Sequence, residues 1–387
     1  MARKVLISGA SIAGCATAWW LARYGFKVVV VEKAPGFRDG GQNVDIRGAG
    51  REVLRRMDLE EDALQHGTGE EGTAWIGEGG DVVARFDQED TGTDGPTAEM
   101  EILRGDLARL LFDHCSKIVE FRFGNTISSV EDSKGRVAVR FENGSVEDFD
   151  LVVVAEGVGS TTREMVFPGE NEPRWLDLSI AYFTIPRIDD DNKLWRWYHT
   201  TGGRGISLRP DQHGTTRAML SVQRRTEGEQ DWSEDRQKAW LREEFEDAGW
   251  EAPRVLAAMD ETEDFYFDAL RQIQMPTWSK GNLVLTGDAA WCVTPMGGVG
   301  ASLAVVGAYI LAGELSKTRD IARALTAYEA LRGKCSGYPQ NGAENGKPPQ
   351  PFGPCVAARH FEASQCTWTA RPIWQAAGVE IRRYGSA

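Results

Sequence analysis

The residues best suited to chemistry lie in one stretch toward the C-terminal end of the chain. A short apolar segment, Leu283–Leu285, predicts a buried strand, and Gly287 and Asp288 follow it. A carboxylate directly after a strand can accept hydrogen bonds from two hydroxyl groups, as a sugar or polyol offers. The stretch therefore predicts a site for a polyhydroxylated ligand, with an ordinary glycine-rich loop as the alternative.

The turn that follows this carboxylate suits a flat ring. It contains one proline and three glycines, Pro295, Gly297, Gly298 and Gly300. Glycine has no β-carbon, so a flat ligand can lie directly against the main chain. A helix is expected from Gly300 to Leu315, with Ala301 in its first turn. Its unpaired N–H groups and its positive dipole end would point at the turn, which favours a ring that becomes anionic.

A second signature lies at the other end of the chain. The predicted strand Val5–Ser8 is followed by a turn of small residues and by a helix over Ala13–Tyr24. A second strand, Lys27–Val31, then ends at Glu32. This strand–helix–strand unit is typical of dinucleotide sites, because glycines allow a tight turn and close helix packing while the acid takes ribose hydroxyls. A serine replaces the middle glycine of the usual pattern. The turn residues assigned to the site are Gly9, Ser11, Ile12, Ala13 and Gly14.

Three further segments carry polar groups that suit a nucleotide. Asp45 and Arg47 lie two residues apart in an extended segment and point to the same face. Arg47 can bind a phosphate bidentately, and a surface Asp–Arg pair is the alternative. Arg104 is placed at the start of a helix, where a cation is disfavoured unless an anion joins it. Glu156 and Gly157 follow another apolar strand, in a further loop that faces a nucleotide.

The middle of the chain, residues 168–277, has a different residue pattern. Apolar and polar residues alternate there, which predicts antiparallel strands. Its aromatic side chains can form the roof of an aromatic pocket. For any one of them, ordinary sheet core is the simpler explanation. The residues assigned to a substrate are Trp195, Trp197, Arg209 and Met219.

The composition excludes several classes of protein. The chain has 387 residues and a net charge of −14, which argues against nucleic acid as a partner because a phosphate backbone demands a positive surface. No apolar run reaches the length of a membrane span, and the N-terminus enters a strand without a leader segment, so a cytoplasmic protein is expected. The six cysteines form no CxxC pair and no zinc-type cluster with histidine, so no metal site is expected.

Together these segments predict an α/β fold, in which a Rossmann-like nucleotide-binding domain is interrupted by an antiparallel β-sheet and ends in C-terminal helices. Residues 1–72, 104–167 and 278–332 are assigned to the nucleotide-binding domain. Residues 73–103 contribute strands to the substrate domain, and 168–277 form its β-rich body. The remainder, 333–387, is a divergent tail, explained either by an unusual terminus or by a shifted reading frame.

Three motifs, taken in order, resemble those of one family. They are Gly9-x-Ser11-x-x-Gly14 with Glu32, then Glu156-Gly157, then Gly287-Asp288 with Pro295 and Gly300. Such motifs are similar to those of the class A flavoprotein monooxygenases, single-component FAD enzymes typified by para-hydroxybenzoate hydroxylase. The likeness covers about residues 3–332 and is greatest to aromatic polyketide hydroxylases and tetracycline-inactivating monooxygenases. It implies an FAD-binding domain of the GR2 type around the inserted sheet.

This resemblance assigns roles to individual residues. Glu32 would bind the adenosine ribose, and Lys33 would lie beside it over the adenine. Arg104 would contact the ribityl–phosphate segment of FAD. Asp288 would bind the ribityl or ribose hydroxyls. Glu156 stands where the family usually has aspartate, a position that serves FAD and NAD(P)H together.

The remaining assignments lie around the flavin. Asp45 and Arg47 would lie near the flavin and the pyrophosphate. Pro295 and the backbone of residues 297–300 would flank the isoalloxazine. No side chain is assigned as a certain catalytic group, because the flavin carries the difficult chemistry in such enzymes.

The implied activity is hydroxylation of an aromatic or enolic small molecule, polyketide- or tetracycline-like, in antibiotic biosynthesis or resistance. NADPH or NADH would reduce FAD, and O₂ would then give a flavin C4a-hydroperoxide that transfers OH to an electron-rich carbon. A monomer or a weak dimer is expected. Two alternatives remain. One is a flavoprotein without monooxygenase activity, and the other is a flavin-dependent halogenase, suggested by Trp195-Arg196-Trp197 although the usual Ile-Pro completion is missing.

Overall fold

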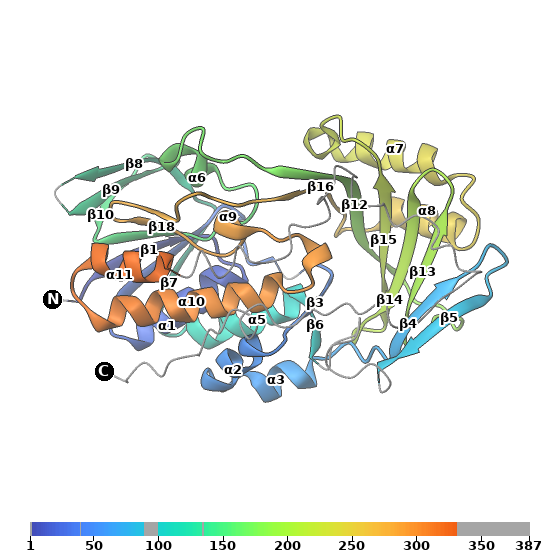
Figure 1. Ribbon diagram of the computed structural model, residues 1–387, viewed down its shortest axis with the longest axis horizontal. Coiled ribbons are helices and arrows are strands. Elements are labelled where there is room, and N and C mark those ends of the chain that lie inside the picture. Colours follow the sequence, from blue (N-terminus) through green and yellow to red (C-terminus); the bar gives the residue numbers. More distant parts are fainter. Residues whose placement is uncertain (1, 39, 89–99, 134, 331–387) are drawn as a thin grey trace.

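The computed structural model describes residues 2–38, 40–88, 100–133 and 135–330. These form two parts that lie along one long axis, with a six-stranded sheet at the centre of the first part and a seven-stranded sheet at the centre of the second (Figure 1). The tail predicted for 333–387 lies outside the described residues.

The six-stranded sheet is the framework of the first part. Its strands run in the order β17-β18-β11-β1-β2-β7, all parallel except β17. The inner strands are short apolar runs buried on both faces, as expected for parallel strands covered on both sides. Their bounds are β1 Lys4–Ser8, β2 Lys27–Glu32, β7 Glu120–Phe123, β11 Leu151–Val154, β17 Ser279–Lys280 and β18 Leu283–Leu285.

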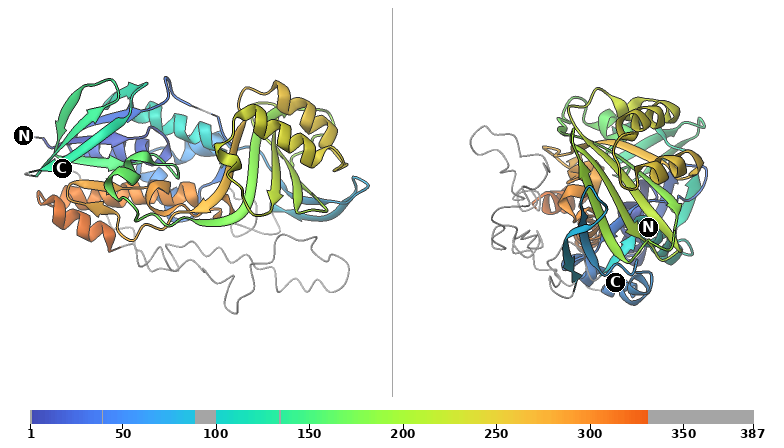
Figure 2. Two further views of the ribbon diagram at one scale, coloured as in Figure 1. Left: turned by 90° about the horizontal axis from the view of Figure 1, so that it is seen from above. Right: turned by 90° about the vertical axis from the view of Figure 1, so that its right-hand side faces the viewer.

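Helices cover one side of this sheet, and the small sheet β10-β9-β8 lies at its outer end (Figures 1 and 2). The long helix α10 packs against α1, α2 and α11 and is buried almost all round, which explains its run of small and apolar residues. The bounds are α1 Ile12–Arg23, α2 Ala49–Arg56, α3 Glu60–Gln65, α5 Arg104–Cys115, β8 Ile127–Ser133, β9 Arg136–Phe141, β10 Val146–Phe149, α6 Thr161–Val166, α9 Asp288–Trp291, α10 Gly300–Lys317 and α11 Ile321–Glu329.

The seven-stranded sheet carries the second part, in the order β16-β12-β15-β14-β13-β4-β5. Alternate side chains pack against α7 and α8 on one face, while the opposite face carries a smaller apolar cluster that includes Met296 of the first part. The bounds are β4 Gly72–Ile76, β5 Val82–Asp87, β12 Arg174–Pro186, β13 Leu194–Thr200, β14 Arg204–Pro210, β15 Thr215–Gln223, α7 Glu234–Phe245, α8 Ala252–Glu261 and β16 Tyr266–Gln272.

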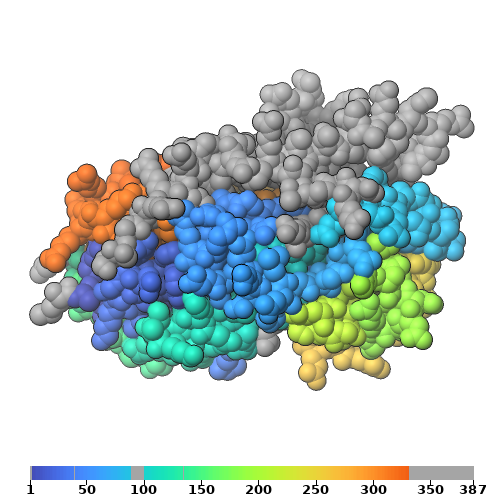
Figure 3. Space-filling view, turned by 90° about the horizontal axis from the view of Figure 1, so that it is seen from below, coloured from blue at the N-terminus to red at the C-terminus, as the bar shows by residue number. Residues whose placement is uncertain are grey.

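A two-stranded sheet lies where the two parts meet. It pairs β3, Asn43–Asp45, with β6, Glu101–Leu103. Strand β6 falls inside the segment 73–103, yet it pairs with β3 of the first part and takes no place in the seven-stranded sheet. On the face drawn in Figure 3, the surface around α2 and α3 continues from the first part to the strands of the second.

Two features are absent from the described ranges. Within them, no helix combines the length and the apolar character needed to cross a membrane. The same ranges hold no group of three or more His, Cys, Asp or Glu side chains placed to bind a metal ion.

Candidate active site

The turn after β1 is built on close backbone approaches. Gly9 has a φ of +107°, and a β-carbon there would lie 2.4 Å from the carbonyl oxygen of Ala155. A β-carbon at Gly14 would lie 1.9 Å from the carbonyl oxygen of Gly9, so only glycine lets α1 begin this close to β1. Ser11 stands before α1, but its side chain makes no capping bond. The first N–H groups of α1 thus lack a side-chain cap and suit an anion.

Glu32 lies at the end of β2 and turns its carboxylate toward this turn. One carboxylate oxygen accepts a hydrogen bond from the backbone N–H of Ala10, and the other accepts one from that of Ala34, both at 2.9 Å. Each oxygen keeps a further lone pair that can accept a ribose hydroxyl. The neighbouring Lys33 is exposed. This position, at the carboxyl end of a parallel strand, supports the predicted contact with a ribose.

Arg104 is a largely buried cation in the first turn of α5. Its guanidinium donates to Ser11 Oγ at 3.1 Å and to the carbonyl oxygen of Gly40 at 2.5 Å. Burial lowers the pKa of Arg104, and none of the described carboxylates pairs with it. A buried cation at a helix start is unfavourable until an anion joins it. A phosphate group at this place would supply the missing charge.

Asp288 begins α9, directly after β18 and Gly287. Solvent reaches its side chain, yet the surrounding protein raises the pKa of Asp288 to about 6 through burial. Among the described residues, no hydrogen-bond or ion-pair partner of Asp288 is found. An acceptor placed in this way suits the hydroxyl groups of a polyol.

The turn between α9 and α10 has an unusual backbone. Thr294 has a φ of +65°, which is rare for a residue with a branched side chain, and its buried hydroxyl has no hydrogen-bond partner among the described residues. Pro295 and Gly298 are exposed, and Gly297 is buried between them. Gly300 then begins α10 without a side-chain cap. A flat ring would therefore meet bare backbone and the positive end of a helix at this turn, as predicted from the glycines.

Asp45 and Arg47 form an ion pair at 2.9 Å. The pair is mostly buried, with side chains 15% and 13% exposed, so it is not the surface pair of the alternative interpretation. The backbone N–H of Arg47 donates to Ser302 Oγ at 2.9 Å, in the first turn of α10. The segment after β3 thus lies beside the helix start and its Ala301.

Glu156 is engaged by the protein itself. Its carboxylate accepts hydrogen bonds from the hydroxyls of Ser8, Ser160 and Thr162, and from the backbone N–H of Thr162 at 3.0 Å. The side chain therefore holds the start of α6 against β1. A cofactor contact at this loop is left to backbone such as that of Gly157.

These groups share one edge of the six-stranded sheet. Glu32, Glu156 and Asp288 each stand at or just after the carboxyl end of a parallel strand, where ligands of open α/β sheets bind. Together they offer a carboxylate for a ribose, a buried cation for a phosphate, a second carboxylate for a polyol and a glycine turn for a ring. This donor set fits FAD.

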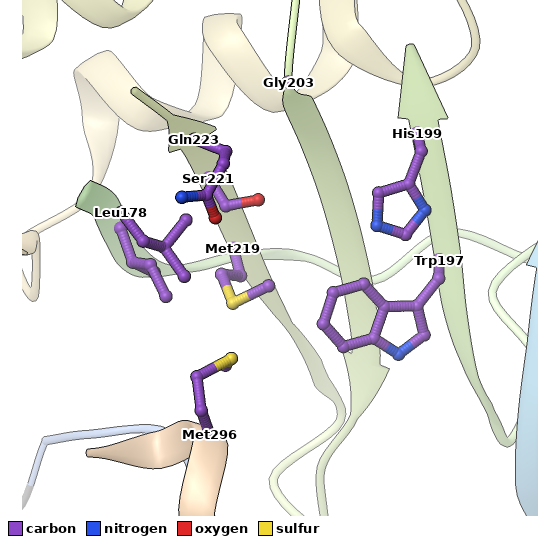
Figure 4. A pocket seen from close by; sticks show the side chains of 9 residues that line it. Leu178, Trp197, His199, Gly203, Met219, Ser221, Gln223 and Met296 are labelled. Carbon is purple, nitrogen blue, oxygen red and sulfur yellow. The ribbon is translucent and has the colours of Figure 1, made fainter. Parts of the chain in front are cut away.

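An open pocket lies on one face of the seven-stranded sheet, and Met296 of the first part is among its lining residues. Figure 4 shows Met296, from the turn after Pro295, facing Met219 of β15, while Trp197 and His199 stand side by side on β13. Two of the residues assigned to a substrate, Trp197 and Met219, thus line this pocket. The remaining lining residues are Leu178, Ile180, Gly203, Ser221 and Gln223.

The other two residues assigned to a substrate lie beside the pocket. Trp195 packs its ring 4.6 Å from that of Trp197, between centroids. The guanidinium of Arg209 lies 3.8 Å from the centroid of Trp195 and forms ion pairs with Glu70 at 2.8 Å and Glu101 at 2.5 Å. Arg209 is therefore a buried link between the two parts of the molecule.

Sequence analysis missed several lining residues. His199 continues the two-residue spacing of Trp195 and Trp197, so alternation along one strand was a signal that could have found it. Ser221 continues the same spacing from Met219 on β15. Met296 had no such signal, because its place depends on how distant segments meet.

Comparison with known proteins agrees with this geometry. The family model described as "FAD binding domain" matches residues 2–334. An uncharacterised protein of Mycobacterium tuberculosis is 38% identical over 82% of this chain and 86% of its own length. A flavin-dependent monooxygenase of Legionella longbeachae is 36% identical over 85% of this chain and 84% of its own length.

Solved structures give the same result. The tetracycline destructase Tet(51) has a TM-score of 0.78 and 32% identity, over 86% of this chain and 87% of that chain. Klebsiella pneumoniae HpxO, solved with FAD and uric acid, shares the fold with a TM-score of 0.71 at 23% identity, over 85% of this chain and 84% of that chain. The chain therefore belongs to the FAD-binding domain family, among the flavin-dependent monooxygenases.

Proposed function

We propose that this protein uses FAD, NADPH or NADH, and O₂ to hydroxylate a flat aromatic or enolic molecule of polyketide or tetracycline type. The overall balance is one substrate C–H converted to C–OH, one O₂ consumed, one NAD(P)H oxidised and one water released. Similarity to the tetracycline destructase Tet(51) supports the substrate class, and similarity to the flavin-dependent monooxygenase of Legionella longbeachae supports the reaction type.

One observation carries the proposal. Met296 belongs to the turn that begins at Pro295, where a ring would lie, and the same Met296 lines the pocket on the face of the seven-stranded sheet. A ring on this turn and a substrate in this pocket would therefore be neighbours. Binding both reactants at one turn replaces a chance encounter with a fixed orientation.

The residues of this chain would perform binding and exclusion. Glu32, Arg104 and Asp288 would hold the ribose, the phosphate and the ribityl hydroxyls of FAD. Bound FAD supplies the hydride acceptance and the O₂ activation that side chains cannot provide. The start of α10 at Gly300 would stabilise negative charge beside the turn. Apolar pocket walls such as Met219 would keep water away from the reacting carbon.

The test is turnover by the purified, FAD-loaded protein. NADPH and NADH oxidation and O₂ uptake are followed with phenolic polyketides and with tetracycline, and products are weighed by mass spectrometry in ¹⁸O₂. The proposal expects one labelled oxygen per product and one NAD(P)H per oxygen. The proposal would be contradicted if no compound of the panel changed the rate of NAD(P)H consumption. A product that carries chlorine in place of the new oxygen would also contradict it.

A further inference from the structure

The pocket wall contains a single titratable side chain among the described residues that line it, His199. The rest of the lining is apolar or neutral, with Trp197, Met219 and Met296 as its large members and Ser221 and Gln223 as its polar ones. No Lys, Arg, Asp or Glu belongs to it. A charged ligand would thus find no opposite charge in the lining, whereas a neutral ring with a hydroxyl group finds apolar walls and polar atoms.

One edge of the His199 ring faces the backbone of Gly205 on the neighbouring strand. In the strand register, His199 lies opposite Gly205, and Gly205 lies opposite Ser221. A β-carbon at Gly205 would stand 2.7 Å from Ser221 Oγ, 3.4 Å from His199 Cδ2 and 3.6 Å from His199 Nε2. Glycine at position 205 therefore lets Ser221 Oγ and the Cδ2–Nε2 edge of the imidazole approach its backbone, which a larger residue would prevent.

The ring is also held in a fixed orientation. His199 stacks on Trp197 with 5.7 Å between ring centroids and 6° between planes. Figure 4 shows the two rings on β13, across the pocket from Leu178. A parallel pair of this kind forms a flat wall, against which a planar substrate can lie with its edge at the imidazole.

We infer that His199 is a specificity-determining residue, which accepts a hydrogen bond from a ring or enol hydroxyl of the substrate. This inference rests on the proposed function for the identity of the site and adds its chemical preference. A neutral, planar, hydroxylated molecule is favoured, while its methyl ether and its carboxylate counterpart are disfavoured. The ether lacks the donor, and the carboxylate lacks a cation to pair with.

The protonation state of His199 agrees with this role. Burial lowers the pKa of His199, so the neutral imidazole that can accept a hydrogen bond is present at neutral pH. Its neighbours across the sheet, Gly205 and Ser221, carry no charge. Arg204, which precedes Gly205 on β14, pairs with Asp247 instead. Trp197, on the same strand, and Met296, from the first part of the molecule, are also uncharged.

Binding to the FAD-loaded protein with oxidised flavin tests the inference without turnover. The probes are 2-naphthol, 2-methoxynaphthalene and 2-naphthoate, with Kd measured from quenching of tryptophan fluorescence or from the flavin spectrum. Wild-type protein should bind 2-naphthol about tenfold more tightly than the methyl ether. His199→Phe keeps the stacked ring without a nitrogen and should remove that preference. His199→Gln keeps a hydrogen-bonding amide and should retain part of it, while His213→Phe, at an exposed histidine, is the matched control.

The pH profile gives a second readout. For wild-type protein, affinity for 2-naphthol should fall as pH drops below the usual range of imidazole, because the imidazolium cannot accept the hydrogen bond. Burial raises the pKa of Asp288 to about 6, so its charge also changes in acid, and the profile is therefore compared with that of His199→Gln, which should lack only the step due to His199. Equal affinity for the naphthol and its ether, an unchanged preference in His199→Phe, or no binding of 2-naphthol up to its solubility would overturn the inference. Preferential binding without turnover of any substrate would instead count against the proposed function alone.

Discussion

A β-carbon placed on Gly287 would lie 2.7 Å from the methyl carbon of Ala13. Gly287 precedes Asp288 near one end of the chain, and Ala13 lies in the first turn of α1 near the other. Gly287 also has a φ of +60°, which is a second reason for glycine at this position. The two predicted nucleotide motifs therefore pack closely, with the methyl group of Ala13 against the backbone of Gly287. The parallel order of β2, β1, β11 and β18 places Glu32 and Asp288 along one sheet edge.

Replacing Asp288 by asparagine should change FAD binding and apoprotein stability in opposite directions. The ionised carboxylate accepts hydroxyl hydrogen bonds, so the variant should bind FAD about tenfold more weakly at pH 8, as measured by fluorescence titration. In the wild type, FAD affinity should fall as pH drops through about 6, where Asp288 becomes protonated. Asp288→Asn should lack that step, and a variant with wild-type FAD affinity would remove Asp288 from the site.

The apoprotein supplies the other half of this test. The folded pKa of Asp288, about 6, lies above the ordinary value of 3.8, so the folded state binds the proton more tightly than the unfolded state does. The contribution of this group to stability is therefore fully present below the ordinary pKa and is lost as pH rises to 6. Asp288→Asn should raise Tm relative to the wild type above pH 6 and leave it unchanged near pH 4.

Replacing Arg104 by methionine should weaken FAD binding without unfolding the apoprotein. The variant lacks the positive charge that would pair with a phosphate group of FAD. A hydrogen bond between charged groups contributes about 1.5–3 kcal/mol, so the Kd for FAD should rise roughly tenfold to a hundredfold. The Tm of the apoprotein should stay level or rise, because a buried cation without a carboxylate partner is removed. Arg242→Met, which breaks a surface pair with Asp260, is the control. Loss of Tm with unaltered FAD affinity would show that Arg104 serves the fold alone.

The sequence predicts those site residues that follow a local pattern, and it misses those whose position depends on long-range contacts. Glu32 and Asp288 each follow a strand, and the carboxyl ends of parallel strands meet at one edge, so local pattern alone places them. His199 and Met296 share a pocket only because β13 of the inserted sheet faces the turn after Pro295, a long-range contact that no local pattern encodes. Thr294 adopts a positive φ that nothing in its residue type announces.

The fold was predictable to a similar degree. The strand–helix–strand unit expected at the N-terminal end is formed by β1, α1 and β2, and the helix expected from Gly300 is α10. The helix expected to start at Arg104 is α5, Arg104–Cys115, and the backbone of Leu103 before it is extended. Helix α8 was not anticipated, since its apolar side faces a sheet whose position is known only from the structure.

Replacing Gly14 by alanine should destabilise the protein far more than replacing Gly36. The new methyl group at Gly14 would stand 1.9 Å from the carbonyl oxygen of Gly9, so the start of α1 must move. Overpacking of this kind costs about 3 kcal/mol or more. A β-carbon at Gly36 meets nothing within 4 Å, and Gly36→Ala should change the free energy of unfolding by less than about 0.5 kcal/mol. Denaturant unfolding of the apoproteins measures both, and equal effects would contradict the close approach.

Replacing Glu156 by glutamine should affect stability more than cofactor binding. Glutamine has an NH₂ group in place of one carboxylate oxygen, so it cannot accept all the hydrogen bonds from Ser8, Ser160 and Thr162. The free energy of unfolding should therefore fall by about 1–3 kcal/mol. Because these contacts hold α6, the Kd for FAD should change less than about threefold in the variant that remains folded. Glu164→Gln, on the exposed side of α6, is the control. A tenfold loss of FAD or NADPH affinity at unaltered Tm would assign Glu156 to the cofactors instead.

Replacing Arg209 by methionine should weaken the junction between the two parts in a way that depends on pH. Arg209 lies between Glu70 and Glu101, whose side chains are 1% and 3% exposed, so its loss leaves two buried carboxylates without a cation. Breaking a buried pair by removing one partner costs about 3–5 kcal/mol.

Burial already raises the pKa of Glu101 in the wild type, and removal of the cation should raise it further. A carboxyl with a raised folded pKa contributes stability at low pH and loses it as pH rises, so the deficit of Arg209→Met should be smaller at pH 5 than at pH 8. Adding Glu101→Gln should recover part of the deficit at pH 8, and thermal unfolding at both pH values measures these effects. A deficit that is independent of pH would show that the packing of Arg209 on Trp195, and not its charge, holds the junction.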